Sequence, residues 1–473
     1  MKTSPEHSVE SVKPVIFAGS SNLDNWPLSR VKDPIQFQRN KREQSSFQIA
    51  LLCATSLPNA KSPLVFVSAN HLKTARKQAD QIGLLDSCQF IVEPIERGNW
   101  QAVIFASALI ARSAPDDLMI LIDSVHTIKN IGAFASAFQQ VRQHMPEKGM
   151  VVFGLAYDPE KHQRMKLTRR KGCSIVNSLL QVAPHHNHGD NTGAEAYSIY
   201  SIGPAFMVSP KQLLDMAKAI NPEEFHSVNM ALQHANSMND ALWADLNMWA
   251  TLEMRHIGDE LHKLTDQFLL RPTDFIVSKK QKESSSHFLH NNTNCNLRGD
   301  GHLIAMIGCK NLEVTTTKDA TLIQPKNLAV NVDELITQMR DAQCPELYHS
   351  SIVQHPWGTE TLIDQNHKSQ VFKIELQPGS SIPEHFHAHR AENWQVLSGL
   401  GTATISGVEH QITTGWTYSI DKNTLHGCTS SNTTPLVFME TRIGDFLHED
   451  DIVHTKVKQR PAYSAGTKAS SPP

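Results

Sequence analysis

One stretch near the C-terminal end constrains the fold more than any other part of the chain. Residues 379–399 contain two histidines two positions apart and a glutamate after four further residues, with a glycine at each end of the stretch: Gly379, His385, His387, Glu392 and Gly399. In a β-strand, side chains two residues apart point to the same face. His385 and His387 are therefore expected to face the interior of a β-structure together.

A second stretch is expected to complete this site. In residues 415–430, a strand pattern after Gly415 is followed by a turn near Asp421–Asn423 and then by His426. If Glu392 and His426 lie on neighbouring strands, three imidazoles and one carboxylate converge. This ligand set suits Zn, Fe, Mn, Co or Ni and leaves positions open for a substrate. His389 continues the alternation, so it is a candidate further ligand or proton carrier.

The N-terminal half shows a different pattern, in which buried strands alternate with helices. Strands are predicted at 15–19, 62–70, 89–94, 118–123 and 149–156, and helices at 72–83, 100–112 and 131–144. This alternation predicts an α/β domain whose mostly parallel sheet is covered by helices on both faces. A His-rich run at 185–189 interrupts the pattern, and we interpret it as part of a loop rather than a metal site.

The chain is expected to divide into four parts. Residues 1–278 form the α/β domain, 279–342 a linker with a small coiled β unit and a helix, 343–456 an all-β barrel, and 457–473 a disordered tail rich in Pro, Ser and Lys.

Composition excludes several classes of function. The net charge is −3, which gives no electrostatic basis for binding nucleic acid or an anionic membrane. No signal peptide and no apolar run of about 18 residues is found, so we expect a cytoplasmic protein without a membrane span. The seven scattered cysteines are expected to be free thiols.

The C-terminal pattern resembles both sequence motifs of the cupin superfamily and, more narrowly, one branch of it. HPWG (355–358), QVFKIELQPG (370–379), HAHRAENW (387–394) and IGDFLHEDDIV (443–453) resemble the type II phosphomannose isomerase domain of bifunctional mannose-1-phosphate guanylyltransferase/mannose-6-phosphate isomerases. Two residues depart from that family: His385 stands where glutamine is common, and His454 where arginine is usual.

This resemblance implies a cupin barrel that interconverts mannose 6-phosphate and fructose 6-phosphate with the help of a divalent metal. The implied metal ligands are His385, His387, Glu392 and His426. Arg390, or alternatively Lys373, is expected to hold the phosphate or the developing oxyanion. The base is expected to be His389 or Glu384, and the sequence does not choose between them.

The N-terminal stretch 15–37 resembles the sugar-nucleotidyltransfer loop of the same family, which implies a nucleotidyltransferase-like, Rossmann-like domain followed by a short β-helix-like unit. The retained positions include the implied nucleotide-binding residues Gly19, Ser21, Arg30 and Gln36. Several positions that carry the chemistry are altered: Ser20 and Asn22 replace glycines, Asp24 an arginine, Ile35 a lysine and Val125 a metal-holding aspartate, for which Asp123 could compensate.

These replacements predict an impaired guanylyltransferase, because nucleotidyl transfer depends on positive groups and N–H donors around the phosphates. Two alternatives remain. In the first, the chain is an active bifunctional enzyme that uses Mg²⁺ and GTP to make GDP-mannose. In the second, it is a non-catalytic sensor of sugar phosphates or nucleotide sugars, or an assembly partner, and a homo-oligomer is possible in either case.

Overall fold

The computed structural model describes most of the chain. The described residues are 11–39, 44–115, 117–142, 150–156, 166–169, 175–176, 179–185, 199–257, 260, 268–272, 276–277, 288–299, 303–326 and 332–454. The chain forms two compact units, residues 1–350 and 351–473, which are described separately below. The predicted disordered tail lies outside the described residues.

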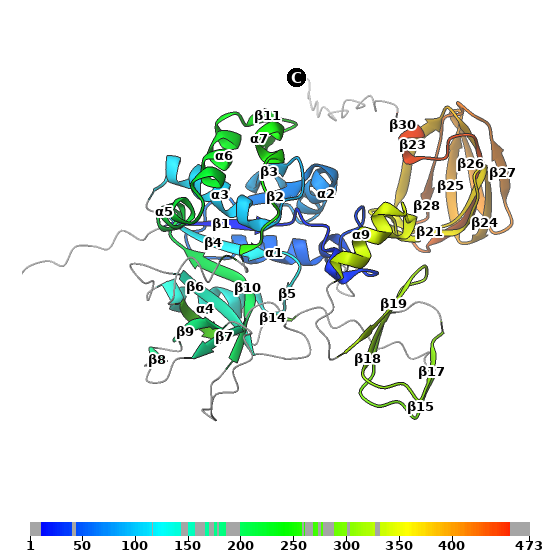
Figure 1. The fold of residues 1–473 in the computed structure, drawn as a ribbon. Helices are drawn as coiled ribbons and strands as arrows, with labels where there is room; N and C mark the ends of the chain where they lie inside the picture. The colour runs from blue at the N-terminus through cyan, green and yellow to red at the C-terminus, as the bar shows by residue number, and fades with distance from the viewer. Residues whose placement is uncertain are drawn as a thin grey trace, which may run out of the picture. The chain divides into compact units, whose positions relative to one another are not determined.

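The first unit is built on a sheet of 12 strands (Figure 1). Its centre is parallel, because β1 pairs in parallel with β2 and β4, and β2 pairs in parallel with β3. These four strands are β1 (Val12–Phe17), β2 (Leu64–Ser68), β3 (Gln89–Glu93) and β4 (Leu118–Asp123). The predicted α/β fold is therefore confirmed.

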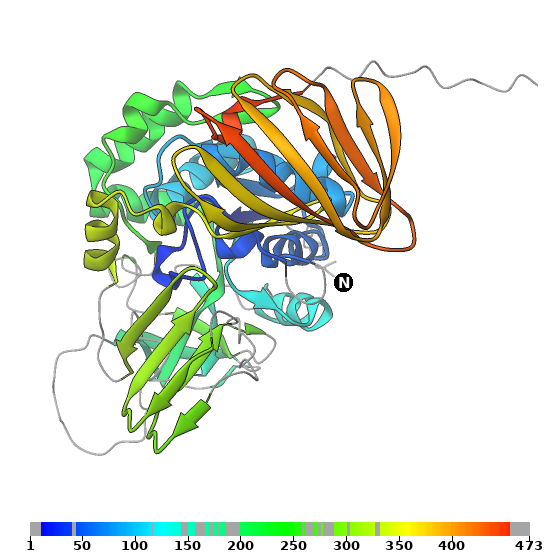
Figure 2. The same ribbon diagram turned by 90° about the vertical axis from the view of Figure 1, so that its right-hand side faces the viewer.

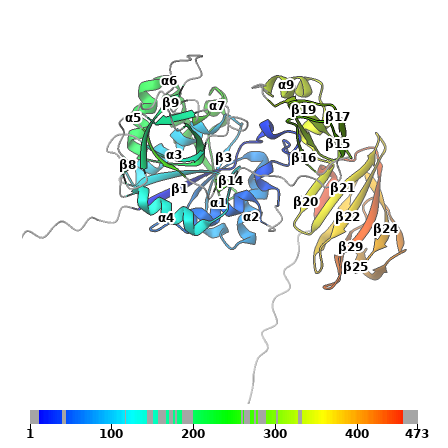
Figure 3. The ribbon, with the colours of Figure 1, turned by 90° about the horizontal axis from the view of Figure 1, so that it is seen from below.

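Helices cover both faces of this sheet (Figure 3). Neighbouring residues of one strand belong to two different cores: Ile16 packs on one side, and Val15 and Phe17 on the other. This double burial explains why the strands read as continuous apolar runs. One face carries α1 (Ser46–Thr55), α2 (Leu72–Gln81) and α4 (Ile131–Arg142), and the other carries α3 (Asn99–Ser113), α5 (Pro210–Ile220), α6 (Pro222–Gln233) and α7 (Leu246–Ala250).

The sheet extends beyond its parallel centre in both directions. On one side β10 pairs antiparallel with β4, and β12 adds to β3 on the other. The added strands are β6 (Met150–Ala156), β7 (Lys166–Arg169), β8 (Ile175–Val176), β9 (Leu179–His185), β10 (Ile199–Val208), β11 (Asn236–Met238), β12 (Ala241–Trp243) and β13 (Phe268–Pro272). Strand β9 ends at His185, and the rest of the predicted His-rich loop lies outside the described residues. A separate short pair joins β5 (Thr127–Ile128) to β14 (Ile276–Val277).

A small β unit and two short helices complete the first unit. The strands are β15 (Phe288–His290), β16 (Asn296–Gly299), β17 (Ala305–Ile307), β18 (Leu312–Thr316) and β19 (Thr321–Pro325), and the helices are α9 (Asp333–Asp341) and α10 (Pro345–Tyr348). β15 pairs in parallel with β17, and β16 with β18, as expected of a coiled β unit. Ile336 and Leu347 pack with Trp26 in a small apolar cluster.

The second unit is a barrel made of two antiparallel sheets (Figure 2). The larger sheet has the order β20 (Ile352–His355), β21 (Gly358–Gln365), β22 (Ser369–Leu376), β29 (Leu436–Gly444), β24 (Arg390–Ser398) and β27 (Thr417–Ile420). The smaller one has the order β26 (Val408–Thr413), β25 (Leu400–Ile405), β28 (His426–Ser430), β23 (Ser381–His387) and β30 (Ile452–His454). This arrangement confirms the predicted all-β barrel.

Alternation along each barrel strand sorts side chains between the interior and the solvent. In β29, the buried residues are Leu436, Phe438, Glu440 and Arg442. The first two belong to the apolar core of the barrel, whereas the last two are charged. The barrel interior is thus apolar toward one end of the strand and ionic toward the other.

Two further sequence expectations concern the whole chain. Among the described residues, no helix is long and apolar enough to cross a membrane. The cysteines within the described ranges, Cys53, Cys88, Cys295, Cys309, Cys344 and Cys428, are all free thiols.

Candidate functional site

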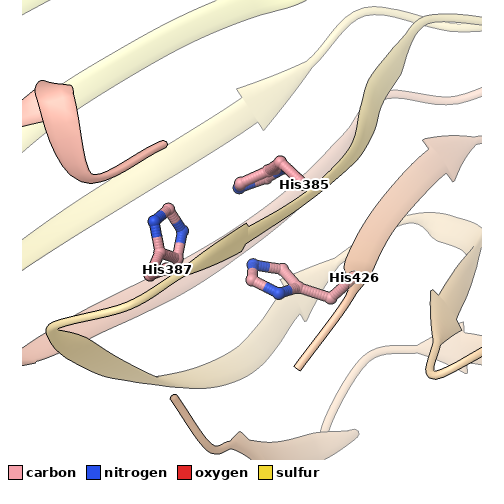
Figure 4. Close-up of side chains that lie close together, drawn as sticks. All are labelled: His385, His387 and His426. Carbon is pink, nitrogen blue, oxygen red and sulfur yellow. The ribbon is translucent and has the colours of Figure 1, made fainter. Parts of the chain in front are cut away.

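Three histidines meet in the ionic half of the barrel (Figure 4). His385 and His387 belong to β23, and His426 is the first residue of the neighbouring β28, directly opposite His385. All three side chains are buried, and one ring nitrogen of each lies within 4.8 Å of the others. The sequence prediction that these histidines share an inward face agrees with this geometry.

Backbone carbonyls fix the orientation of the rings. The Nδ1 atom of His385 lies 2.8 Å from the carbonyl oxygen of Pro383, and that of His426 lies 2.8 Å from the carbonyl oxygen of Thr424. The Nδ1 atom of His387 lies 3.3 Å from the carbonyl oxygen of Asp451. A carbonyl only accepts hydrogen bonds, so we assign the proton to each Nδ1. With the proton on Nδ1, Nε2 is the nitrogen of each ring that can act as a metal ligand.

The carboxylate of Glu392, on β24 of the larger sheet, closes the cluster. Its Oε1 atom lies 2.9 Å from Nε2 of His387, and its Oε2 atom lies 3.3 Å from Nε2 of His426. The indole N–H of Trp394 donates to Oε2 at 3.1 Å and holds the carboxylate in place. The two sheets therefore contribute three imidazoles and one carboxylate to the same cluster.

The charge states of the clustered side chains favour the binding of a cation. Burial, reinforced by the neighbouring His426, lowers the pKa of His385 to about 4, so this ring is neutral near pH 7. Burial alone would raise the pKa of Glu392, but the contacts of its carboxylate with His387 and His426 outweigh burial and hold that pKa well below its usual value. Burial would likewise lower the pKa of His426, yet contact with Glu392 raises it.

These residues fit a divalent metal ion. The Nε2 atom of His426 is buried and has no hydrogen-bond partner, which is costly unless a ligand satisfies it. A neutral imidazole set with one ionised carboxylate is a usual donor set for first-row transition metals and zinc.

Arg390 lies beside the cluster and is buried. Its Nε–H donates to Oε1 of Glu392 at 3.2 Å, and one terminal nitrogen lies 3.3 Å from Nε2 of His387. Burial and the nearby Arg442 lower the pKa of Arg390. The guanidinium therefore contacts two of the clustered side chains and brings a positive charge to the site.

Three predicted catalytic residues lie away from the cluster. His389 breaks the alternation, because β23 ends at His387 and the next two residues form a bend, which leaves the ring of His389 62% exposed. Glu384 is exposed, next to an irregularity in the pairing of β23 with β28. Lys373 alternates with the buried Phe372 and pairs with Glu375 at 3.5 Å on the outer face. None of the three side chains lies in the histidine cluster, and their expected catalytic roles stay predictions.

The structure adds two interior residues that the sequence reasoning missed. Glu440 and Arg442 of β29 are buried, and they form an ion pair of 2.6 Å. Arg442 stands opposite Glu392 in the strand register and also contacts Glu360 at 3.2 Å. Burial and the neighbouring Glu392 raise the pKa of Glu440 to about 7, although Arg442 opposes the rise. The alternation of side chains between the two faces of the strand LVFMETRIG (436–444) would have identified both residues as facing the interior.

Asp451 is a third residue that the sequence reasoning missed. It belongs to the short helix η5 (Glu449–Asp451) that precedes β30. Its carboxylate accepts the backbone N–H groups of Ala388 and His389 and lies 2.7 Å from Nδ1 of His389. Because its carbonyl also contacts His387, Asp451 holds the turn that follows the histidine pair from both sides.

A second candidate site lies in the first unit, beyond the carboxyl ends of β1, β3 and β4. A pocket of about 80 Å³ is lined there by Gly19, Ser20, Asn22, Glu93, Glu96 and Asp123, among others. The replaced position Val125 also lines it, close to Asp123. No lysine or arginine is found among the described residues that line this pocket.

Only one of the four expected nucleotide-binding residues, Gly19, lines this pocket. The Ser21 side chain bonds to Glu96, and Gln36 holds the loop through the carbonyls of Ala18 and Ser20. Arg30 is buried and forms an ion pair of 2.9 Å with Asp319, in the small β unit. Arg30 does not line this pocket, and its expected contact with a nucleotide stays a prediction.

Comparison with known proteins agrees with this two-part architecture. Residues 343–456 match the family model described as mannose-6-phosphate isomerase C-terminal. The chain is 26% identical to a mannose-1-phosphate guanylyltransferase of Klebsiella pneumoniae, an alignment that covers 94% of this chain and 98% of the relative. It is 25% identical to the alginate biosynthesis protein AlgA of Pseudomonas syringae, covering 93% and 95% of the two chains.

A solved structure of a mannose-1-phosphate geranyltransferase from Thermus thermophilus is similar at a TM-score of 0.49 and 16% identity, covering 70% of this chain and 99% of that one.

The fold, the site and these matches together indicate an enzyme of two parts, with an α/β unit followed by an all-β barrel that holds a histidine cluster. More specifically, the chain is similar to bacterial mannose-1-phosphate guanylyltransferases along nearly its whole length, and residues 343–456 match the family model described as mannose-6-phosphate isomerase C-terminal.

Proposed function

We propose that the barrel is a metal-dependent isomerase that interconverts mannose 6-phosphate and fructose 6-phosphate. The observation that carries this proposal is the cluster of three buried, carbonyl-oriented histidines, two of which contact the carboxylate of Glu392. The match of residues 343–456 to an isomerase domain supports the substrate class. The name of the alginate relative suggests a place in the supply of polysaccharide precursors.

His385, His387, Glu392 and His426 would hold the metal, which is Zn, Mn, Fe, Co or Ni on the chemistry of these donors. When bound, the ion would polarise the substrate oxygens and favour the charge that develops on them. Arg390 holds Glu392 in place and adds a second positive charge beside the reacting oxygens. Together these groups make the ionic end of the barrel suitable for an anionic sugar.

Isomerisation requires a base that moves a proton between two carbons. The proton on C2 of the open-chain aldose is removed and returned to C1, while the proton on O2 passes to O1. We assign the carbon-to-carbon transfer to Glu440, because it is buried in the ionic half of the barrel and has a pKa of about 7. A group with a pKa near the working pH both accepts and releases a proton readily.

The test combines metal analysis with an isomerase assay on the full-length protein. His387→Ala is expected to lose both bound metal and turnover of mannose 6-phosphate. His389→Ala is the matched control, because this histidine lies two residues away but is largely exposed. Bound metal without turnover of mannose 6-phosphate in the wild type would refute this substrate.

We further propose that the first unit is impaired as a guanylyltransferase. Its pocket offers a triphosphate no lysine or arginine from the described residues, and the carboxylates of Glu96 and Asp123 line it instead. Charges of the same sign repel a nucleoside triphosphate. Formation of GDP-mannose from GTP, mannose 1-phosphate and Mg²⁺ at a rate typical of enzymes would establish the alternative, an active bifunctional enzyme.

A third possibility is a non-catalytic sensor or an assembly partner in an oligomer. It is favoured only if the protein turns over neither hexose phosphates nor GTP, yet binds a sugar phosphate or a nucleotide sugar.

A further inference from the structure

The loop after β1 makes a compact set of hydrogen bonds with one carboxylate. The hydroxyl of Ser20 donates to Oε1 of Glu96 at 2.7 Å, and the backbone N–H of Ser21 donates to the same oxygen at 3.0 Å. The hydroxyl of Ser21 donates to Oε2 at 2.8 Å. Both oxygens of Glu96 are therefore bound by the loop, in the way that such a loop would bind the oxygens of a phosphate group.

The two partners meet where an α/β fold binds its ligands. Ser20 and Ser21 follow the central strand β1, whereas Glu96 lies between β3 and α3. Ligands of open α/β sheets bind beyond the carboxyl ends of the strands, between such loops. The contact of Glu96 with the loop therefore fills a position that a ligand would otherwise occupy.

Other features of the pocket also favour the exclusion of anions. The side chain of Glu93 lies under the loop and is buried, with 5% of its surface exposed. A Cβ at Gly19 would lie 2.3 Å from its Oε2 atom, so this carboxyl group packs directly under the loop. Burial and the nearby Glu96 raise the pKa of Glu93 to about 8, which indicates surroundings that disfavour negative charge.

One feature of the same pocket favours anions. Gly98 and Asn99, at the start of the 15-residue helix α3, line the pocket. The N-terminus of a helix attracts negative charge through its free N–H groups and its dipole. Without Glu96, the pocket would combine this helix start with the donors of Ser20 and Ser21. Glu96 itself is then the group that decides whether a phosphate enters.

We propose that Glu96 is an internal anion that occupies the donors of the Ser20–Ser21 loop, and that phosphate groups are excluded from this pocket while it is in place. This inference rests on the proposal that the transferase is impaired, and it attributes that impairment to the side chain of Glu96. It predicts that removal of the carboxylate opens the loop to free phosphate.

The experiment measures the binding of inorganic phosphate, and of GTP with Mg²⁺, to the full-length protein by titration calorimetry. Glu96→Ala is expected to bind phosphate at least about tenfold more tightly than the wild type, the effect of one charged hydrogen bond. Glu96→Gln keeps an acceptor oxygen but no charge, so it is expected to lie between the two and serves if the alanine variant does not fold. Asp215→Ala, in which an exposed carboxylate of α5 is removed, is the matched control.

The outcomes separate the two proposals. If neither Glu96 variant binds phosphate better than the wild type and Asp215→Ala, Glu96 is not the excluding group, although the transferase can still be impaired. If the wild type binds GTP tightly and forms GDP-mannose, both proposals fail. Gained phosphate binding in the Glu96 variants, with weak binding in the wild type and the control, supports the internal anion.

Discussion

Replacing Asp451 with alanine tests whether the short helix η5, just before β30, holds the histidine cluster in place. The substitution removes acceptors for the N–H groups of Ala388 and His389, at 3.1 Å each, and for the ring of His389 at 2.7 Å. A hydrogen bond to a charged group contributes about 1.5–3 kcal/mol. Water replaces the contact to the exposed ring, so we expect the two backbone contacts to cost about 3 kcal/mol of unfolding free energy.

The effect on the metal is expected to be larger than this loss of stability suggests. Asp451 also contacts Nδ1 of His387 through its carbonyl, and movement of the turn would misdirect that ring. Loss of such an outer contact lowers metal affinity by about 10–100-fold. Affinity is measured by competition with a chromophoric chelator, and unfolding by denaturant titration of the metal-free protein.

The neighbouring residue supplies the control. The side chain of Asp450 is 81% exposed, and among the described residues it contacts the side chain of His448. Asp450→Ala is expected to bind metal like the wild type. If Asp451→Ala holds the metal as tightly as Asp450→Ala does, the argument that Asp451 organises the cluster is wrong.

Three further predictions concern the barrel. Arg390→Lys keeps the charge but not the fixed fork of donors, so kcat/KM for mannose 6-phosphate should fall by about tenfold or more, and an unchanged value would remove Arg390 from the mechanism. Glu440→Gln should lower kcat by about 10²–10⁴-fold with the metal content retained, whereas full activity would exclude it as the base. Metal affinity should rise with pH, because the proton held by His426 through its raised pKa must leave before the metal binds, and a profile without pH dependence from pH 5 to 8 would contradict this.

Much of the site was predictable because successive side chains of a strand alternate between its two faces. The spacing of His385 and His387 placed both side chains on one face, and the same rule applied to β29 would have found Glu440 and Arg442. The rule fails at His389, because the sequence does not show where β23 ends. That end is held by Asp451, 62 residues further along the chain.

The N-terminal site shows a second limit of sequence reasoning. The altered residues of the loop predicted the loss of positive charge around the pocket, and the described residues that line it agree. The contact of Glu96 with Ser21 could not be predicted, because it joins residues 75 positions apart. The ion pair of Arg30 could not be predicted for a similar reason, since its partner Asp319 is 289 residues away.

The position of β30 has a consequence for how the barrel matures during synthesis. This strand pairs with β23, yet it follows every other strand of the barrel in the chain. A nascent chain can begin to fold before it is complete, and its earlier parts fold first. The histidines of β23 and β28 would then come together before Asp451 is available to hold them. We therefore expect that a released chain that ends just before Asp451 forms most of the barrel but captures metal weakly, and that firm metal capture is a late event in biosynthesis.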